Sequence, residues 1–353
     1  MITIGIDAHK RTHTAVAVDE LGRQLGTKTT RATTTEDHLS IIRWADQFGA
    51  ERTWAVEDCR HLSRRLERDM LAAGETIVRV PTKLMAKARD AARTYGKSDP
   101  IDALAVARAA LREPELPTAH LDENAREIRL LVDHREDLVA ERTRHINRVR
   151  WHFHEIDPGW EPKARGLTSF KNLDLAERRL TKDTSVIARI ALALIRRIRE
   201  LTVEINAISA ELDERTMTRA AHLREIHGVA ALGAAKLIAE VAGVGRFKSR
   251  HAFARHNGTA PLPVWSGNRE RHRLSRTGNR QLKAAIHRIA LTQARHHPDA
   301  IAFLTRRTER GDTGKEAVRA LKRRLSDIVY RAMLADLAVG TTGAHARSAA
   351  SAA

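Results

Sequence analysis

Cysteine and aromatic residues are scarce in this chain of 353 residues. The single cysteine, Cys59, excludes an internal disulfide framework and a cysteine-rich zinc site. Aromatic residues make up only 4% of the chain, whereas alanine, leucine, isoleucine and arginine are abundant. This balance predicts a mostly helical protein whose cores are packed with aliphatic side chains.

Long apolar runs are also missing. No stretch reaches the roughly 18 consecutive apolar residues that a membrane helix needs. The N-terminal residues lack the basic start and the apolar core of a secretion signal. We therefore expect a cytoplasmic protein without a membrane partner.

Acidic residues are outnumbered, with 44 aspartates and glutamates against 62 lysines and arginines, so the formal net charge is +18. Such a positive field favours nucleic acid as the partner. A coding bias toward arginine and alanine is the alternative explanation, but it would spread the excess evenly. Instead, the stretch from Arg246 to Lys283 contains ten basic residues and one acid, Glu270. Its net charge of +9 is half of the total excess of +18. This concentration predicts a phosphate-binding surface.

The patterning along the chain divides it into four segments. Residues 1–115 alternate short β-rich runs with helical spacing, which predicts an α/β domain with a mixed sheet. Residues 116–221 form long helical patterns, and residues 222–337 predict a third, mainly helical domain. Residues 338–353 are rich in alanine, serine and glycine, and we expect them to be disordered.

The middle segment carries a nearly heptad apolar seam, which predicts an antiparallel helix pair or an intermolecular coiled coil. The seam consists of Ile187, Ile190, Leu194, Ile198, Leu201, Ile205, Ile208 and Leu212. The third segment opens with residues 226–235, a glycine-bounded turn similar to a helix-hairpin-helix. Such turns present backbone amides to phosphate.

Carboxylates follow two of the predicted strands. Asp7 ends the first strand and Glu57 the fourth, so parallel neighbouring strands would bring both to one edge of the sheet. Asp99 and Asp102 are three residues apart and share a face if they lie on one helix. Helix capping around Pro100 is the alternative role for this pair. Four carboxylates without cysteine suit Mg²⁺ or Mn²⁺, and two such ions can assist a phosphodiester displacement.

Ser266 lies within the basic stretch, in a segment bounded by proline and glycine that we expect to be a loop. It is either a phosphate contact or turn cap, or a nucleophile whose developing charge nearby arginines neutralise. The residues predicted to contact nucleic acid are Arg269, Arg271, Arg273, Arg276, Arg280 and Lys283.

These motifs resemble one family over nearly the whole chain, the IS one-ten insertion-sequence transposases. Three segments are similar to the parts of the family's DEDD set: residues 5–10 (GIDAHK), the pair at Val56 and Glu57, and residues 97–103 (KSDPIDA). Ser266 and Gly267 fall where its second domain carries a nucleophilic serine. Trp265, where glutamine is common, and residues 257–261 depart from the family pattern.

The resemblance implies an RuvC-like domain of the ribonuclease H fold that binds Mg²⁺ through Asp7, Glu57, Asp99 and Asp102. It also implies that Ser266 attacks DNA as a serine recombinase, within a homo-oligomer (a dimer or tetramer). An element-encoded guide (bridge) RNA would pair with the donor and target DNA.

Two other functions stay open at the level of sequence. The first is a metal-dependent nuclease of the Holliday-junction-resolving kind, in which Ser266 only contacts phosphate. The second is a basic nucleic-acid scaffold without catalysis, in which the acids are caps and ion pairs.

Overall fold

The computed structural model describes residues 1–58, 60–82, 84–85, 98–113, 115–162, 165–266, 269–274 and 278–351. Within these ranges, side chains are described except at residues 60–61, 266, 269–274 and 340–351. The chain forms two compact units that do not follow chain order. The first contains residues 1–122 and 242–334, and the second contains residues 123–241 and 335–353. The four consecutive segments expected from the sequence stay a prediction at the level of domains.

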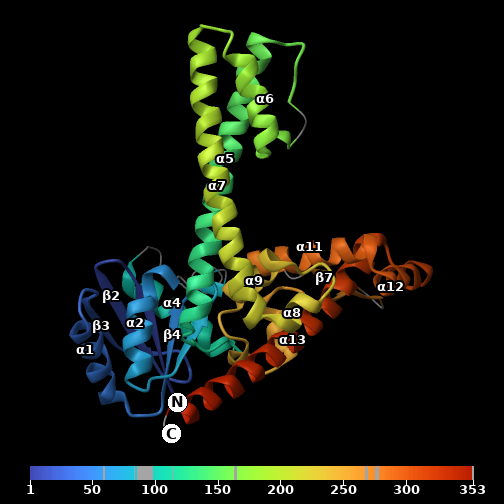
Figure 1. Ribbon diagram of the computed structural model, residues 1–353. Helices are drawn as coiled ribbons and strands as arrows, with labels where there is room; N and C mark the ends of the chain where they lie inside the picture. The colour runs from blue at the N-terminus through green and yellow to red at the C-terminus, as the bar shows by residue number, and fades with distance from the viewer. Residues whose placement is uncertain are drawn as a thin grey trace. The chain divides into compact units, whose positions relative to one another are not determined.

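The N-terminal part of the first unit contains a five-stranded mixed sheet (Figure 1). Its strands are β1 (Ile2–Ala8), β2 (Thr12–Val18), β3 (Gln24–Arg31), β4 (Arg52–Glu57) and β5 (Ile77–Val80). The sheet order is β3-β2-β1-β4-β5. The pairs β1–β2 and β2–β3 are antiparallel, whereas the pairs β1–β4 and β4–β5 are parallel. The predicted mixed sheet is therefore confirmed, and β1 and β4 meet the condition of parallel neighbours under which Asp7 and Glu57 reach one edge.

Helices cover both faces of this sheet. On one face, Ile4, Ile6, Trp54 and Val56 form a core with α1 (Thr35–Ala45) and α2 (Arg60–Ala72). On the other face lies α4 (Asp99–Arg112), whose alanines pack against β1 and β2. Alternation along the strands produces this division, because successive side chains point to opposite faces.

Gly5 allows α4 to approach β1 closely. A Cβ atom at this position would lie 2.1 Å from the carbonyl oxygen of Ala103 and 2.5 Å from the amide nitrogen of Ala107. Only glycine leaves room for such a contact between backbones. The contact determines how the first turn of α4 lies over the end of β1.

The rest of the first unit consists mainly of helices. Its elements are η3 (Val244–Arg246), α10 (Arg250–His256), β6 (Pro261–Ser266), β7 (Arg269–Leu274), α11 (Arg280–His296), α12 (Pro298–Glu309) and the start of α13 (Gly314–Ser351). One expectation was wrong here. Residues 261–266 form a strand of a hairpin rather than a loop, since a two-stranded ribbon has an open edge on each strand that tolerates Pro261 and Pro263. At the end of the chain α13 continues to Ser351, and the disordered tail expected from residue 338 stays a prediction.

The second unit is built on two long helices, α5 (Glu123–Ile156) and α7 (Val186–Arg219), which lie side by side (Figure 1). Their contacts show that they run antiparallel. Arg135 donates to Ser209 and Arg142 donates to Thr202, so higher numbers on α5 meet lower numbers on α7. The predicted antiparallel helix pair is confirmed within one chain, whereas the intermolecular coiled coil stays a prediction.

The first part of the predicted seam on α7 was wrong by one position. Ile190 is 43% exposed, and the buried residues there are Ala188, Ala191 and Ile195. These side chains pack against α6 (Phe170–Leu180), which shifts the buried face. From Ile198 onward the predicted seam is the buried one.

The predicted helical turn at residues 226–235 joins α8 (Ala221–Glu225) to α9 (Ala231–Val241). Gly228 has φ of 90°, a left-handed conformation that favours glycine in a turn of this kind. No described helix combines the length and the apolar character that crossing a bilayer requires.

Candidate active site

Asp7 lies at the end of β1, on the face of the sheet that α4 covers. Ile4 and Ile6 point into the core of the opposite face, so Gly5 and Asp7 point toward α4. Asp7 is 6% exposed. A carboxylate buried at the end of an apolar strand is costly unless something compensates its charge.

The second contribution comes from the first turn of α4. Ser98 is the N-cap and Pro100 occupies the first turn, so Asp99 is a helical residue and does not cap the helix. Asp102 is buried on the same helix one turn later, whereas the Asp99 side chain is 50% exposed. The partial positive charge of the helix N-terminus favours both acids.

His9 brings the two elements together. Its Nε2 atom lies 2.9 Å from Oδ2 of Asp7 and 3.7 Å from Oδ1 of Asp99. One ligand atom from each of these three residues lies within 4.8 Å of the other two. His9 was not among the predicted site residues, although its place two residues after Asp7, directly after an alternating strand, was a usable signal.

Burial dominates the electrostatics of Asp7 and raises the pKa of its carboxyl group. The hydrogen bond with His9 opposes this rise in pKa, while the charges of Asp102 and Asp99 add to it. The site therefore concentrates negative charge around the buried carboxyl group of Asp7. Such an arrangement favours a bound cation.

Glu57 lies at the same edge of the sheet. The parallel register pairs Ile6 with Val56, so Asp7 and Glu57 follow one residue later on neighbouring strands. Alternation then directs both toward the α4 face. The structure thus groups Asp7, His9 and Asp99 through side-chain distances and brings Glu57 to the same edge through strand register.

The donor set fits a hard divalent cation. Mg²⁺ and Mn²⁺ prefer oxygen ligands at about 2.0–2.2 Å and usually keep several waters. Ligand atoms that all lie within 4.8 Å of one another can surround one such ion. An imidazole beside two carboxylates shifts the preference toward Mn²⁺, which accepts nitrogen more readily than Mg²⁺ does.

The predicted basic surface is only partly described. The side chains of Ser266, Arg269, Arg271 and Arg273 and the whole of Arg276 lie outside the described residues. The backbone places residue 266 at the end of β6, paired with residue 269 of β7. Arg280 is exposed at the start of α11, and Lys283 is half-buried one turn later.

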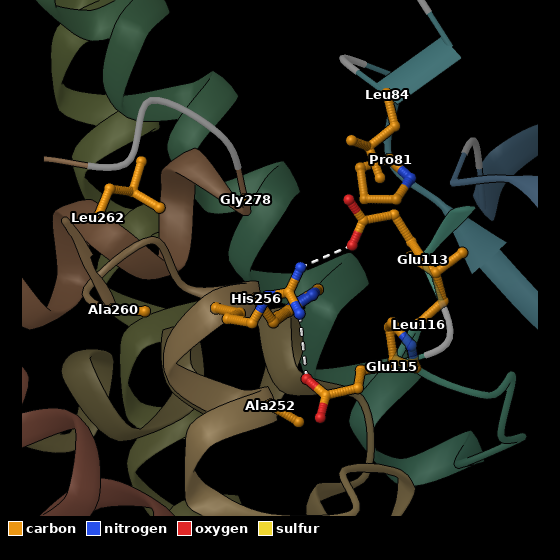
Figure 2. Close-up of a pocket in the computed structure, with 12 residues that line it drawn as sticks. Pro81, Leu84, Glu113, Glu115, Leu116, Ala252, His256, Ala260, Leu262 and Gly278 are labelled. Carbon is orange, nitrogen blue, oxygen red and sulfur yellow. Dashed lines mark hydrogen bonds and ion pairs between the residues drawn. The ribbon is translucent and has the colours of Figure 1, made fainter. Parts of the chain in front are cut away.

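Two arginines counted in the basic run have structural partners. Arg255 bonds to Glu115 at 3.1 Å and to Glu113 at 2.6 Å, beside a cavity of about 260 Å³ (Figure 2). Arg246 is 7% exposed, and its guanidinium lies over the ring of Phe247. The sequence alone overestimates the charge that this stretch offers to a partner.

The cavity in Figure 2 is mostly apolar and is separate from the carboxylates. Its walls come from the segments around Pro81 and Leu116 and from α10 and Leu262. None of the predicted site residues that the structure describes lines it.

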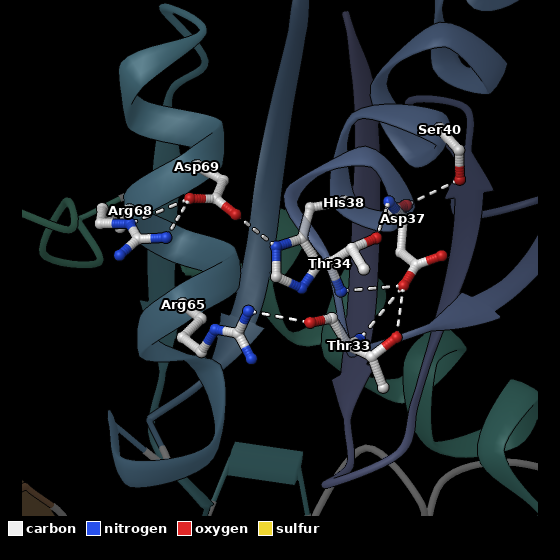
Figure 3. A network of polar contacts seen from close by, with 8 residues as sticks. All are labelled: Thr33, Thr34, Asp37, His38, Ser40, Arg65, Arg68 and Asp69. Atoms are coloured by element: carbon white, nitrogen blue, oxygen red, sulfur yellow. Dashed lines mark hydrogen bonds and ion pairs between the residues drawn. The ribbon is translucent and has the colours of Figure 1, made fainter.

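A second polar network lies on the opposite face of the sheet (Figure 3). His38 of α1 contacts Asp69 of α2 at 2.7 Å, and Arg68 bonds to the same carboxylate at 2.8 Å. His38 and Asp69 are 1% and 6% exposed. This network joins α1 to α2 and lies on the far side of the sheet from Asp7, so we assign it a structural role.

Comparison with known proteins identifies two family regions. Residues 4–158 match the family model of the DEDD transposase domain of IS110 elements. Residues 220–305 match the model of the transposase IS116/IS110/IS902 family. The first region contains Asp7, Glu57, Asp99 and Asp102, and the second contains Ser266.

Two insertion-element proteins are similar over nearly their whole length. The insertion element IS116 uncharacterized 44.8 kDa protein of Streptomyces clavuligerus is 29% identical, covering 95% of each chain. The insertion element IS900 uncharacterized 42 kDa protein of Mycobacterium paratuberculosis is 27% identical, covering 95% of this chain and 96% of that protein.

Among solved structures, Thermus thermophilus RuvC matches in two forms. Alone it aligns with a TM-score of 0.28, and in complex with a Holliday junction substrate with a TM-score of 0.27, at 16% identity in both cases. Each alignment covers 34% of this chain and essentially all of the RuvC chain. The two family regions, which together span more than half of the chain, and the two full-length relatives confirm the resemblance seen in the sequence: the chain belongs to the IS110 family of insertion-sequence transposases.

Proposed function

We propose that this transposase cuts and rejoins DNA with two sets of groups, a divalent-metal site at the sheet edge and a nucleophilic Ser266. The metal site is supported by one observation: ligand atoms of Asp7, His9 and Asp99 lie within 4.8 Å of one another, and Glu57 lies at the same edge of the sheet. Asp7, Asp99, Glu57 and Asp102 are the residues that would hold Mg²⁺ or Mn²⁺. When bound, the ion would supply Lewis-acid stabilisation of charge on the reacting phosphate.

The residues of the site have separate tasks in this proposal. Burial and crowding of Asp7 with Asp99 and Asp102 make the empty site electrostatically unfavourable, which strengthens cation binding. The imidazole of His9 is half-exposed, and its Nε2–H donates to the Asp7 carboxylate at 2.9 Å. The other ring nitrogen, Nδ1, is then the one that can take up a proton from an attacking hydroxyl.

Ser266 is proposed to act by transesterification. Its Oγ forms a bond to phosphorus, the bond from phosphorus to one deoxyribose oxygen breaks, and the hydroxyl proton passes to a base. Attack by a second DNA hydroxyl then releases the serine and restores a phosphodiester, so no external energy source is needed. The family resemblance supports this role, and so does the position of residue 266 within the family region 220–305.

DNA is the proposed substrate, with a guide RNA as the element that selects donor and target. The net charge of +18 supports a nucleic-acid partner. Basic residues that grip the phosphate backbone carry no sequence information, so delegating base recognition to pairing with RNA is physically reasonable. A homo-oligomer would allow serine and carboxylates from different subunits to act together.

The test is a search for a covalent protein–DNA adduct. Full-length protein is incubated with Mn²⁺, DNA carrying the element's ends, and RNA transcribed from its flanks, then denatured and resolved on a gel. We expect the wild type to form DNA-linked protein, and Ser266→Ala and Asp7→Asn to form none. Asp299→Asn is the control, because Asp299 is an acid in the first turn of α12 and does not belong to the group formed by Asp7, His9 and Asp99.

The gel also separates the competing functions. Cut DNA without an adduct, still produced by Ser266→Ala, would identify a hydrolytic nuclease in which the serine only contacts phosphate. DNA binding without cutting in the wild type, unaffected by Asp7→Asn, would leave only the scaffold.

A further inference from the structure

The charge of the second unit is divided between the two ends of its helix pair. Arg142 of α5 donates to Thr202 of α7, so residues 142–202 form one end, and residues 123–141 and 203–241 form the other. The first end contains 14 lysines and arginines and 7 acids, a net charge of +7. The second contains 7 lysines and arginines and 12 acids, a net charge of −5. The basic end therefore attracts polyanions, whereas the acidic end repels them.

Pairing within the basic end leaves part of its positive charge unused. Five of its acids bond to arginines of the same end: Asp157 to Arg179, Glu161 to Arg150, Asp174 and Glu177 to Arg199, and Glu200 to Arg197. Four exposed arginines make no ion pair and no side-chain hydrogen bond with the residues that the structure describes: Arg144 and Arg148 on α5, and Arg189 and Arg196 on α7. Their charges are available to a ligand.

An exposed aromatic side chain follows two of these arginines on α5. Arg144, Arg148 and Trp151 are spaced by four and three residues, so they lie along one side of the helix. Trp151 is 72% exposed, and its ring meets that of His154 edge-on, with the ring centroids 6.2 Å apart. Glu155 comes one turn after Trp151, so the stripe carries two cations, an indole and one acid.

This combination has the chemistry of a surface for single-stranded nucleic acid. Arginines contact backbone phosphates, and an exposed aromatic ring stacks on a base that has no neighbour of its own. The bases of a duplex are already stacked on one another, so a duplex offers Trp151 no free base. A second copy of this chain does not fit on the same surface, because two ends of net charge +7 repel each other.

We propose that Arg144, Arg148 and Trp151 bind a single-stranded polynucleotide, with phosphates on the two arginines and a base stacked on the indole. The unpaired strand comes from RNA or from opened DNA, which present the same phosphates and the same aromatic bases. The proposal rests on the proposed function, in which nucleic acids are the ligands. It adds a contact surface on the helix pair, apart from the basic stretch between Arg246 and Lys283.

The first test removes the aromatic ring. Binding of the full-length protein to a labelled unstructured single-stranded RNA, the same sequence as single-stranded DNA, and the corresponding DNA duplex is measured by fluorescence anisotropy over a range of salt concentrations. We expect Trp151→Ala to bind a single strand about tenfold more weakly, the effect of losing one stacked base. The slope of log affinity against log salt should stay the same, because no charge is lost. Trp151→Phe should retain most of the affinity.

The second test removes one charge from the stripe. Arg148→Gln should lower the salt slope on a single strand by about 0.7, the share of one neutralised phosphate. Arg219→Gln is the matched control, since Arg219 is also an exposed arginine of a long helix but lies on α7 in the acidic end. This variant should keep the slope of the wild type.

The three ligands separate the possible results. Weaker binding of RNA alone identifies the guide as the source of the strand, and weaker binding of single-stranded DNA alone identifies the substrate; either result supports the surface. Unchanged binding of both single strands by Trp151→Ala would overturn it, and so would an equal loss of affinity for the duplex.

Two further measurements exclude other roles for Trp151. Because its side chain is mostly in water, Trp151→Ala should keep the melting temperature and the oligomeric state of the wild type. A lower melting temperature would assign the ring a structural role, and a changed elution volume in size-exclusion chromatography would assign it to contacts between copies. Either result contradicts the proposal.

Failure of this proposal differs from failure of the proposed function. Asp7→Asn should lose adduct formation while binding single strands like the wild type, whereas Trp151→Ala should bind them more weakly. A wild type that binds no nucleic acid would contradict the proposed function itself. A wild type whose single-strand binding is the same in Trp151→Ala would contradict only the surface on α5.

Discussion

At the scale of single residues, burial decides what a carboxyl group in this protein can do. Asp37 is exposed in the capping box of α1, where hydrogen bonds from Thr33 and Thr34 lower its pKa to about 2. Asp7 is buried, and its pKa moves in the opposite direction. The first group completes a helix end, whereas the second needs a counter-charge, which is what a metal site provides.

The need of the buried Asp7 for a counter-charge predicts that the group formed by Asp7, His9 and Asp99 binds Mn²⁺. Asp99→Asn removes one negative ligand from the group of three and should weaken Mn²⁺ binding at least tenfold. Isothermal titration calorimetry with Mn²⁺ measures this without any catalytic readout. Asp299→Asn should bind Mn²⁺ like the wild type, and equal affinities for both variants would place the ion elsewhere.

His13 makes the fold sensitive to mild acid. It is 2% exposed on β2, with its ring 5.3 Å from that of His38. Burial, followed by the charges of His38 and His9, lowers its pKa from 6.5 to about 4. The unfolded chain therefore binds a proton at pH values where the folded chain does not. This contribution to stability is fully present above pH 6.5 and is lost as the pH falls toward 4, in total about 3 kcal/mol.

Urea unfolding from about pH 7 to about pH 4.5 measures the loss for wild type and His13→Leu. The leucine variant should lose clearly less stability over this interval, since the titrating group is gone. An identical loss in both proteins would mean that His13 is not responsible.

At the scale of elements, the site depends on how closely a helix approaches a strand. Gly5→Ala would bring a Cβ atom to 2.1 Å from the Ala103 carbonyl, so α4 must move away from β1. We expect a destabilisation of about 1–3 kcal/mol. We also expect DNA cutting and Mn²⁺ binding to be lost, because Asp99 moves with the helix. Denaturant unfolding measures the loss of stability, and calorimetry measures the loss of Mn²⁺ binding.

Gly74→Ala is the matched control for this prediction. Gly74 has φ of 84° at the end of α2, with nothing within 4 Å of an added Cβ. Its substitution strains the backbone and should reduce stability by about 1 kcal/mol without altering metal binding. If Gly5→Ala behaves in the same way, the close packing of α4 is not what positions the site.

At the scale of the whole molecule, part of the charge excess is neutralised within the fold and is not offered to a partner. Arg271 and Arg273, which we predict to contact nucleic acid, occupy alternate positions of β7. Arg255 is instead neutralised by Glu113 and Glu115. Sequence position alone does not separate these two classes of arginine.

Replacing Arg271 and Arg273 by glutamine should therefore weaken nucleic-acid binding. The salt slope on duplex DNA should fall by about 2, because each phosphate that an arginine neutralises accounts for about 0.9 of that slope. Arg255→Gln should leave the slope unchanged, since its charge is already paired. A slope that responds only to Arg255→Gln would reverse this assignment.

Much of the α/β part was determined by the sequence itself. Alternation over five or more residues identifies a strand without knowledge of its partners, and a carboxylate at the end of such a run marks the sheet edge. The sequence therefore placed Asp7 and Glu57 at one edge on the condition that their strands are parallel neighbours, and β1 and β4 meet that condition. Ser266 as a nucleophile came from the family resemblance, and its side chain lies outside the described residues.

Only the tertiary structure decided the features that depend on contacts between distant segments. The packing of α6 selected Ala188, Ala191 and Ile195 over the more hydrophobic seam on α7. Hairpin pairing turned residues 261–266 into a strand despite their prolines. The partners of Arg255 and the burial of Arg246 likewise follow from long-range packing. The desolvation and pairing of a charge are set by its surroundings in space and not by its neighbours along the chain.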